Sequence, residues 1–226
     1  MVDDAMAAVQ PGMLSRVPLR DQAAEVLRNM VVSGALSSGE RINEADLASR
    51  LGISRGPLRE AIQRLGAEGF IEFHQNRGAF VRSFNLDDLR QMYEAREVIE
   101  VKAAQLAARR ATGDGIARLQ DLLSAVDEVW RTDTTGAYPV EFDLHELVLD
   151  LAGNPYLQRA GIDLQNQVRL ARTKSGSSPE RARDAFTEHQ EILAAIADRD
   201  PKRAGKAMTT HIQNSLTHLT TSKDMR

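Results

Sequence analysis

Residues 53–70 read ISRGPLREAIQRLGAEGF, and this stretch decides how the first part of the chain folds. Its apolar side chains recur at helical spacing and predict a buried stripe made of Leu58, Ala61, Ile62 and Leu65. Ser54 stands at the N-cap position, and Pro57 lies in the first turn, where a missing N–H costs nothing. Gly69 ends the pattern. The sequence therefore predicts one short amphipathic helix with a well-defined start.

The polar side of this helix carries two arginines four residues apart. Arg55 and Arg59 lie beside the buried stripe rather than within it, and Gln63 continues their face. Guanidinium groups at the N-terminal end of such a helix can donate to O6 and N7 of guanine or to phosphate. Exposed arginines more often only keep the surface of a helix in contact with water. The elements on either side of this helix distinguish between the two interpretations.

The flanking elements complete a winged helix-turn-helix. Upstream, apolar positions at 19, 23, 26, 27 and 30 predict one helix, Asn43 caps a second, and Gly52 forms the turn. Downstream the period changes to two, and residues 70–73 and 79–82 predict a hairpin. The predicted tip of this wing consists of Asn76, Arg77 and Gly78. The order helix, helix, turn, helix, hairpin indicates a small DNA-binding domain.

Composition limits the possible function classes. The chain has 226 residues, a formal net charge of −3 and no cysteine, which excludes disulfides, thiolate metal sites and cysteine nucleophiles. Although the chain is acidic, residues 50–82 hold six arginines against three glutamates, a local basic surface suited to phosphate. The N-terminal residues lack signal-peptide features, and no apolar run approaches the roughly 20 residues of a membrane span. We expect a cytoplasmic protein without a membrane partner.

From residue 85 onward the periodic segments are all helical. We expect about six helices, over 86–111, 114–132, 139–151, 155–174, 179–198 and 201–221. Ser178–Pro179 and Asp200–Pro201 are typical pairs of an N-cap residue and a proline at the first helical position. The predicted fold class is mainly α, with a mobile tail at 1–14, the winged domain at 15–83 and an all-α bundle at 84–226.

The helical part holds four of the five histidines. His145 follows Glu141 by four residues on a predicted helix, while His189 and His211 lie in apolar stripes of two later helices. Buried polar side chains need partners, and three imidazoles with a carboxylate suit a divalent metal such as Zn²⁺, Ni²⁺ or Mn²⁺. The alternative is that each histidine is a hydrogen-bonded core or boundary residue, because long sequence gaps separate them.

Residues 47–81, LASRLGISRGPLREAIQRLGAEGFIEFHQNRGAFV, resemble the winged-helix DNA-binding domain of GntR-family bacterial transcriptional regulators. The resemblance implies that Arg55 and Arg59 contact operator bases and phosphates and that the wing enters the minor groove. Ser54 and Gln63 belong to the same predicted DNA surface. Gly56 departs from the family pattern, which commonly has threonine there, so the hydroxyl of that position is missing in this chain.

The helical part is similar to the FCD ligand-binding domain of the FadR-like branch of that family. The matching segments are YEAREVIEVKAAQLAA (93–108), FDLHELVLDLAGNPYL (142–157) and EHQEILAAIADRDPKRAGKAMTTHI (188–212). The resemblance implies metal ligands at Glu141, His145, His189 and His211. Glu141 departs from the family, which has aspartate at that position. Asp143, only two residues before His145, is expected to face away, and His218 lies two turns beyond His211 near the end of the chain.

The same resemblance assigns Arg96 to the effector cavity, where it would hold a carboxylate ligand together with the metal. The alternative for Arg96 is a surface salt bridge with Glu100, four residues further on. Arg169 and Arg172, on the fourth helix of the bundle, are further candidates for the effector site.

These expectations describe a metabolite-responsive transcriptional regulator, a repressor if it follows the commoner behaviour of the family. Because one recognition helix reads few bases, we expect a homodimer on a pseudo-palindromic DNA operator. An organic acid bound beside the metal would change operator affinity through its different affinities for two states. Two alternatives stay open: the same regulator with a metal-free effector pocket, and a metal-dependent hydrolase, which leaves Arg55, Arg59 and the wing unexplained.

Overall fold

The structure is a computed structural model, and it describes residues 17–132, 143–172 and 178–221. The chain divides into two compact units, residues 1–82 and 83–226. The sequence predicts this boundary one residue later, between residues 83 and 84. Helices dominate both units, and a small two-stranded sheet follows the helices of the first one. The predicted fold class, a winged helix-turn-helix followed by a helical bundle, is confirmed.

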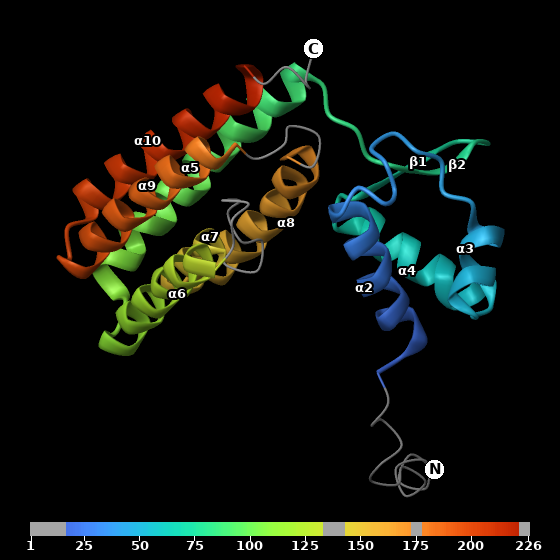
Figure 1. Cartoon of the computed structure of the whole chain (residues 1–226), viewed down its shortest axis with the longest axis horizontal. Coiled ribbons are helices and arrows are strands. Elements are labelled where there is room, and N and C mark those ends of the chain that lie inside the picture. The colour runs from blue at the N-terminus through green and yellow to red at the C-terminus, as the bar shows by residue number, and fades with distance from the viewer. Residues whose placement is uncertain (1–16, 133–142, 173–177, 222–226) are drawn as a thin grey trace, which may run out of the picture. The chain divides into compact units, whose positions relative to one another are not determined.

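The first unit is built from α2 (Leu19–Val32), α3 (Glu44–Leu51), α4 (Arg55–Ala67), β1 (Ile71–His74) and β2 (Gly78–Val81) (Figure 1). The two strands are antiparallel, with Ile71 opposite Val81. Helix α4 packs against α2, α3 and β1, and the four residues of its predicted apolar stripe are at most 2% exposed. Because this stripe is buried, the opposite face of α4, which carries its polar residues, points toward solvent.

Two of the three predicted turn and cap assignments hold in detail. The side chain of Asn43 accepts the backbone amides of the second and third residues of α3, and Gly52 ends that helix with a left-handed backbone, φ 65°. Ser54 occupies the N-cap position of α4 with an extended backbone, but its hydroxyl accepts no capping bond from any described amide. Ser54 therefore occupies the predicted N-cap position without a side-chain capping bond, and this residue lies on the exposed surface of the unit.

The second unit contains six helices among the described residues: α5 (Leu86–Arg110), α6 (Gly113–Thr132), α7 (Leu144–Leu151), α8 (Pro155–Arg172), α9 (Pro179–Ala197) and α10 (Pro201–Thr221). Helix α5 packs against α7, α8, α9 and α10, and Figure 1 shows it running alongside α9 and α10. Four fully buried alanines at 103, 104, 107 and 108 let these helices approach α5 closely. In the ranges that the structure describes, no helix is long and apolar enough to cross a membrane.

The helix predicted over 139–151 begins at Leu144 in the structure. Asp143 is its N-cap residue, with an extended backbone at φ −100° and ψ 95°, and its carboxylate accepts two backbone amides, including that of His145. An aspartate in this role ends the helical backbone on its N-terminal side. Glu141 and residues 139, 140 and 142 lie outside the described residues, so the shared helix face of Glu141 and His145 stays a prediction.

Candidate functional site

The recognition face of the first unit follows from the packing of α4. Burial of the apolar stripe leaves the four polar residues predicted to meet DNA exposed: Ser54, Arg55, Arg59 and Gln63. The side chain of Arg59 is 63% exposed and donates through Nε to Oε2 of Glu44, at the start of α3, over 2.7 Å. This ion pair was not predicted. It joins the two helices of the helix-turn-helix on its exposed side.

The wing places its predicted tip residues on a tight, exposed turn. Asn76 and Gly78 both have left-handed backbone conformations, φ 60° and φ 97°, which bring the chain back into β2. Arg77 between them is exposed, and its guanidinium carbon lies 5.5 Å from the centre of the Phe80 ring. The ring thus holds one cationic side chain at the wing without neutralising its charge.

A second arginine at the wing was missed by the sequence analysis. Arg41, in the loop before α3, forms an isolated antiparallel bridge with Phe80 of β2. A Cβ atom placed on Gly78 would lie 3.8 Å from Nε and 3.9 Å from an Nη of Arg41, so the guanidinium lies next to the tip of the wing. The sequence held no signal for this placement, because the segment around Arg41 has no strand period. Arg41 and Arg77 together give the wing two cations.

The second unit brings together three of the four predicted metal ligands. His145 from α7, His189 from α9 and His211 from α10 offer ring nitrogens that all lie within 4.8 Å of one another. The three residues are 7%, 5% and 1% exposed. The ring centroids of His189 and His211 are 4.6 Å apart, and the Nε2 atoms of His145 and His211 are 3.2 Å apart. Glu141, the fourth predicted ligand, lies outside the described residues.

Two carboxylates, Glu100, which is buried, and Glu188, which is partly buried, orient these imidazoles. Nδ1 of His145 lies 2.7 Å from Oε2 of Glu100, and Nδ1 of His211 lies 2.7 Å from Oε2 of Glu188. A carboxylate next to Nδ1 favours the proton on that nitrogen, which leaves Nε2 with a free lone pair. Since the two Nε2 atoms face each other, the carboxylates direct both lone pairs to one point. Glu100 was considered only as a partner of Arg96, and Glu188 was missed, because sequence spacing does not show which carboxylates other helices bring to a histidine.

Burial controls the ionisation of this cluster. Desolvation lowers the pKa of His211 to about 3, although the hydrogen bond to Glu188 opposes the shift. Desolvation also lowers the pKa of His189 well below its usual range. For Glu188, burial raises the pKa, but hydrogen bonds from His211, Arg181 and Asn214 outweigh it and bring the pKa to about 2. The two imidazoles are therefore neutral at pH 7 and the carboxylate is ionised, which are the forms that metal coordination requires.

This ionisation makes the stability of the metal-free helical unit depend on pH. His211 has a pKa of about 3 when folded and 6.5 as a free side chain, so its contribution is complete above pH 6.5 and is lost as the pH falls toward 3. We expect His211 alone to lower the free energy of unfolding by about 2 kcal/mol between pH 6.5 and pH 5. The measurement is urea unfolding of chelator-treated protein, followed by the fluorescence of Trp130 on α6, the only tryptophan of the chain.

The matched variant for this prediction is His211→Gln, which removes the titrating group. Its unfolding free energy should fall less steeply over the same interval, by about 1 kcal/mol per pH unit. Glu188 does not affect the slopes between pH 6.5 and pH 5. Its contribution to the free energy of unfolding is present above pH 4.5 and is lost only as the pH falls toward about 2. Equal slopes for the two proteins would show that His211 is not held neutral by burial.

Arg96 is fully buried in the core of the second unit. Its Nε donates to Oε1 of Glu100 over 2.8 Å, so the predicted pairing with Glu100 exists but is not at the surface. The same carboxylate accepts a hydrogen bond from Gln165 of α8. Desolvation lowers the pKa of Arg96, but the negative charge of Glu100 outweighs it and raises the pKa overall. One terminal nitrogen of Arg96, Nη1, is buried without a hydrogen-bond partner among the described residues.

The other two predicted effector arginines differ in their surroundings. Arg172 donates to the hydroxyl of Ser215, which lies 3.2 Å from the hydroxyl of buried Tyr93. Burial raises the pKa of Tyr93, but the charges of Arg172 and Arg96 lower it below its usual value. Arg172 is therefore electrostatically close to the same polar core. The guanidinium of Arg169 instead pairs with the carboxylates at the start of α7, on Glu146 and Asp143.

Neither Asp143 nor His218 joins the histidine cluster. The carboxylate of Asp143 caps α7 and lies 3.5 Å from Arg169, in agreement with the expectation that Asp143 faces away. His218 is only partly buried, and the described group of possible ligands consists of the three other histidines of the helical part.

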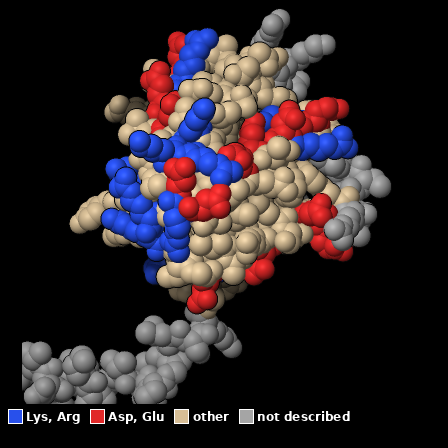
Figure 2. Space-filling view, turned by 90° about the vertical axis from the view of Figure 1, so that its left-hand side faces the viewer, with Lys and Arg blue, Asp and Glu red and all other residues tan. Residues whose placement is uncertain are grey.

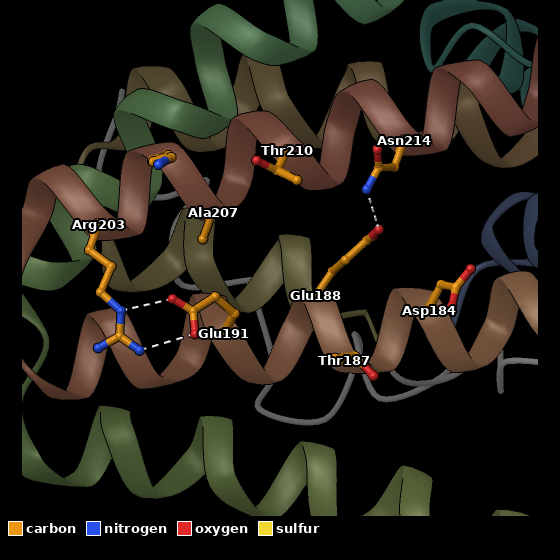
Figure 3. Close-up of a pocket in the computed structure, with 9 residues that line it drawn as sticks. Asp184, Thr187, Glu188, Glu191, Arg203, Ala207, Thr210 and Asn214 are labelled. Atoms are coloured by element: carbon orange, nitrogen blue, oxygen red, sulfur yellow. Dashed lines mark hydrogen bonds and ion pairs between the residues drawn. The ribbon is translucent and has the colours of Figure 1, made fainter.

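A groove on the outside of the second unit reaches Glu188, one of the two carboxylates beside the histidine cluster. It has a volume of about 620 Å³ and lies between α9 and α10, and its lining includes Glu188, Glu191, Arg203 and Asn214. Figure 3 shows Asn214 bonded to Glu188 and Arg203 bonded to Glu191 across the groove. Glu188 therefore has one side toward His211 in the interior and another toward this groove.

The face drawn in Figure 2 carries charges of both signs. Lys and Arg side chains gather toward one side of this view, with Asp and Glu directly beside them and across the rest of the face. Ion pairs in the second unit, such as Arg203 with Glu191 and Arg118 with Asp150, show the same mixing.

Comparison with known proteins connects both units to one family. Residues 19–81 match the family described as bacterial regulatory proteins, gntR family, and residues 91–214 match the FCD domain. The chain is 34% identical to the Nta operon transcriptional regulator of Aminobacter aminovorans, over 81% of this chain and 86% of that protein. It is 26% identical to the HTH-type transcriptional repressor RspR of Escherichia coli, over 87% of this chain and 86% of that protein.

Solved structures agree with these sequence matches. A putative GntR transcriptional regulator from Rhodococcus sp. RHA1 has a TM-score of 0.74 at 25% identity and covers 89% of this chain and 97% of that one. E. coli McbR/YncC, at 21% identity, shares the fold with a TM-score of 0.76 over 91% of this chain and 98% of that one. The chain is therefore a transcriptional regulator of the bacterial gntR family, with a DNA-binding helix-turn-helix and an FCD effector-binding domain.

Proposed function

We propose that this regulator senses a small organic acid that binds beside a divalent metal in the FCD domain, and that binding of the acid releases the protein from its operator. The convergence of three buried histidines from three helices carries this proposal. A core does not need three imidazoles within 4.8 Å of one another for stability, because each one adds a desolvation cost. A metal ion satisfies all three at once.

The donor set fits a transition metal. At Zn–N distances of about 2.05 Å, two ligands of a tetrahedral site are about 3.3 Å apart, and the Nε2 atoms of His145 and His211 are 3.2 Å apart. Both residues have a carboxylate at Nδ1, the usual arrangement behind metal-bound histidines. His145, His189 and His211 would hold the metal, with Glu141 as the proposed fourth ligand. Imidazole ligands suit Zn²⁺ and Ni²⁺, and a carboxylate would also admit Mn²⁺.

Arg96 is the proposed partner of the acid. Its buried Nη1 has a hydrogen still to donate, since none of the described residues accepts it, and a ligand carboxylate would be a charge-assisted acceptor. Arg172, hydrogen-bonded to Ser215 near Tyr93, is a second proposed contact on the same polar core. The role of Arg169 in effector binding stays a prediction, because its guanidinium already contacts the carboxylates of Glu146 and Asp143. A metal that takes up the acid at coordination positions beyond these four protein ligands would supply the remaining attraction.

Regulation requires that the acid prefer one arrangement of the DNA-binding units over another. We propose a homodimer, because two recognition helices related by twofold symmetry read a pseudo-palindromic operator that one helix cannot specify. The description of RspR as a repressor supports repression as the mode of action here. We also propose membership of the FadR-like branch and action on DNA in the cytoplasm.

The competing proposal is the same regulator with a metal-free pocket, in which the histidines bind the acid by hydrogen bonds. Metal-loaded and chelator-treated protein distinguish the two when each is titrated with a panel of hydroxy acids and dicarboxylic acids, with DNA affinity measured by fluorescence anisotropy. Under our proposal at least one acid shifts the DNA affinity about 5- to 150-fold, and only in the loaded protein. An equal shift in both preparations would favour the metal-free pocket. No observation favours the hydrolase alternative.

The carboxylate shell gives a separate prediction. Glu188→Gln should weaken metal binding about 10- to 100-fold, because the amide no longer favours the tautomer of His211 that leaves Nε2 free. The measurement is Zn²⁺ titration in competition with a chromophoric chelator. Glu191→Gln is the matched control, because Glu191 lines the same groove on the same helix but pairs with Arg203. Equal affinities for the two variants would remove Glu188 from the metal site.

A further inference from the structure

The ion pair between Arg59 and Glu44 is unusual for a surface that has to meet DNA. Glu44 is the first residue of α3, and its Oε2 accepts the Nε hydrogen of Arg59 over 2.7 Å. The side chains of Arg59 and Glu44 are 63% and 33% exposed, so the pair lies on the solvent side of the helix-turn-helix. A carboxylate at this place repels phosphate and by itself lowers the affinity for every DNA sequence.

Fold stability does not explain the pair. Exposed ion pairs contribute little to the free energy of unfolding, since the gain in attraction is largely offset by screening and lost side-chain freedom. The backbone of α3 is already fixed at this end by the side chain of Asn43, which accepts two amides. The effect of Glu44 must therefore be sought in what it does to Arg59.

We infer that Glu44 is a positioning residue that sets the base specificity of Arg59. The carboxylate takes up Nε, so the two terminal nitrogens of the guanidinium stay available as a fork. A guanidinium whose Nε is bonded to a carboxylate has fewer orientations than that of an unrestrained arginine. Bidentate donation to O6 and N7 of guanine requires one particular orientation of the two terminal nitrogens. An arginine without this restraint could turn toward phosphate, which carries no sequence information. Glu44 thus lowers affinity for all DNA and raises the preference for the correct base.

The first unit offers a matched control for this inference. Asp46, on the same helix, forms an exposed pair with Arg50 over 2.9 Å, four residues further along α3. Asp46→Asn removes one negative charge from α3 without touching the partner of Arg59. Glu44→Gln removes the same charge and keeps the size of the side chain. A difference between these two variants therefore reports the contact with Arg59 and not the charge of the helix.

The experiment uses the full chain and a pool of DNA duplexes with a randomised central segment. Bound duplexes are sequenced for wild type, Glu44→Gln, Asp46→Asn and Arg59→Ala, and affinity for the unselected pool is measured by anisotropy. For Glu44→Gln we expect equal or tighter binding to the unselected pool and a preference reduced about fivefold at the base pairs that Arg59→Ala also affects. Asp46→Asn should keep the wild-type preference at those base pairs. Thermal melting confirms that each variant is folded.

The double variant Glu44→Gln/Arg59→Ala separates positioning from a direct role. If Glu44 acts through Arg59, the double variant has the same base preferences as Arg59→Ala alone. Two results would overturn the inference. One is tighter binding by Glu44→Gln with unchanged base preferences, which would make Glu44 only a repulsive charge. The other is a further loss of preference in the double variant, which would mean that Glu44 contacts a base itself.

Discussion

Arg59→Ala is expected to lower affinity for the selected operator about 5- to 150-fold while leaving the fold intact. The range corresponds to the 1–3 kcal/mol of discrimination that one bidentate contact to a base provides. Arg59 is 63% exposed and contributes nothing to the buried stripe of α4, so its loss should not unfold the unit. Affinity for unselected DNA should fall far less, and the ratio of the two affinities should therefore drop.

Anisotropy titrations at several salt concentrations provide the measurement. For the wild type, affinity should fall steeply with rising salt, because contacts to phosphate release counterions. Arg41→Ala, at the wing, should act as a phosphate contact and reduce the slope by about one, with little change in base preference. Arg118→Ala serves as a control, because its guanidinium is exposed and pairs with Asp150 in the helical unit, outside the predicted DNA surface. An Arg59→Ala variant with wild-type operator affinity would remove α4 as the recognition helix.

His189→Ala is expected to abolish the stabilisation that Zn²⁺ gives to the FCD domain. Metal at 100 times its dissociation constant stabilises the folded form by about 2.7 kcal/mol, and this corresponds to a rise in Tm of about 5–11 °C for a chain of this size. The ring of His189 lies 4.6 Å from that of His211 and 5.5 Å from that of His145, so no other described residue can take its place at the centre of the cluster. The fluorescence of Trp130, which lies on α6, follows melting of this domain.

His74→Ala is the matched control for this experiment. His74 is an exposed histidine of the wing, in the first unit, and it contacts Glu72 on the same strand. Its removal takes away one imidazole without changing the cluster, and Zn²⁺ should stabilise this variant as much as the wild type. A rise in Tm that survives in His189→Ala would mean that Zn²⁺ binds elsewhere on the chain.

Local patterns predicted most of the fold. Apolar spacing identified the buried stripe of α4, and Asn43 and Gly52 marked the limits of α3, because caps and turns depend on near neighbours in the chain. Asp143 shows where this approach fails. Apolar spacing continued across it, so the sequence predicted one helix over 139–151, whereas a carboxylate that accepts two amides starts the helix at residue 144. Ser54 was placed correctly as an N-cap residue but makes no capping bond to the described amides.

The sites were predicted less completely than the fold. His189 and His211 could be selected because each falls in an apolar stripe, which indicates burial, and His145 was selected together with Glu141, four residues before it. The carboxylates behind them, Glu100 and Glu188, could not be paired with their histidines, since that pairing depends on how α5, α9 and α10 pack. The contact of Glu44 with Arg59 has the same origin, because it joins residues of two helices across the Gly52 turn.

Elemental analysis of the untagged protein, purified without chelator, tests the metal site most directly. We expect about one equivalent of Zn, Ni or Mn per chain in the wild type and almost none in His189→Ala, because the cluster that the structure describes consists of only three histidines. Absence of metal from the wild type, even after incubation with each of the three ions, would contradict the account. The histidines would then bind the effector without metal, and the assignment of the winged helix-turn-helix to DNA would be unaffected.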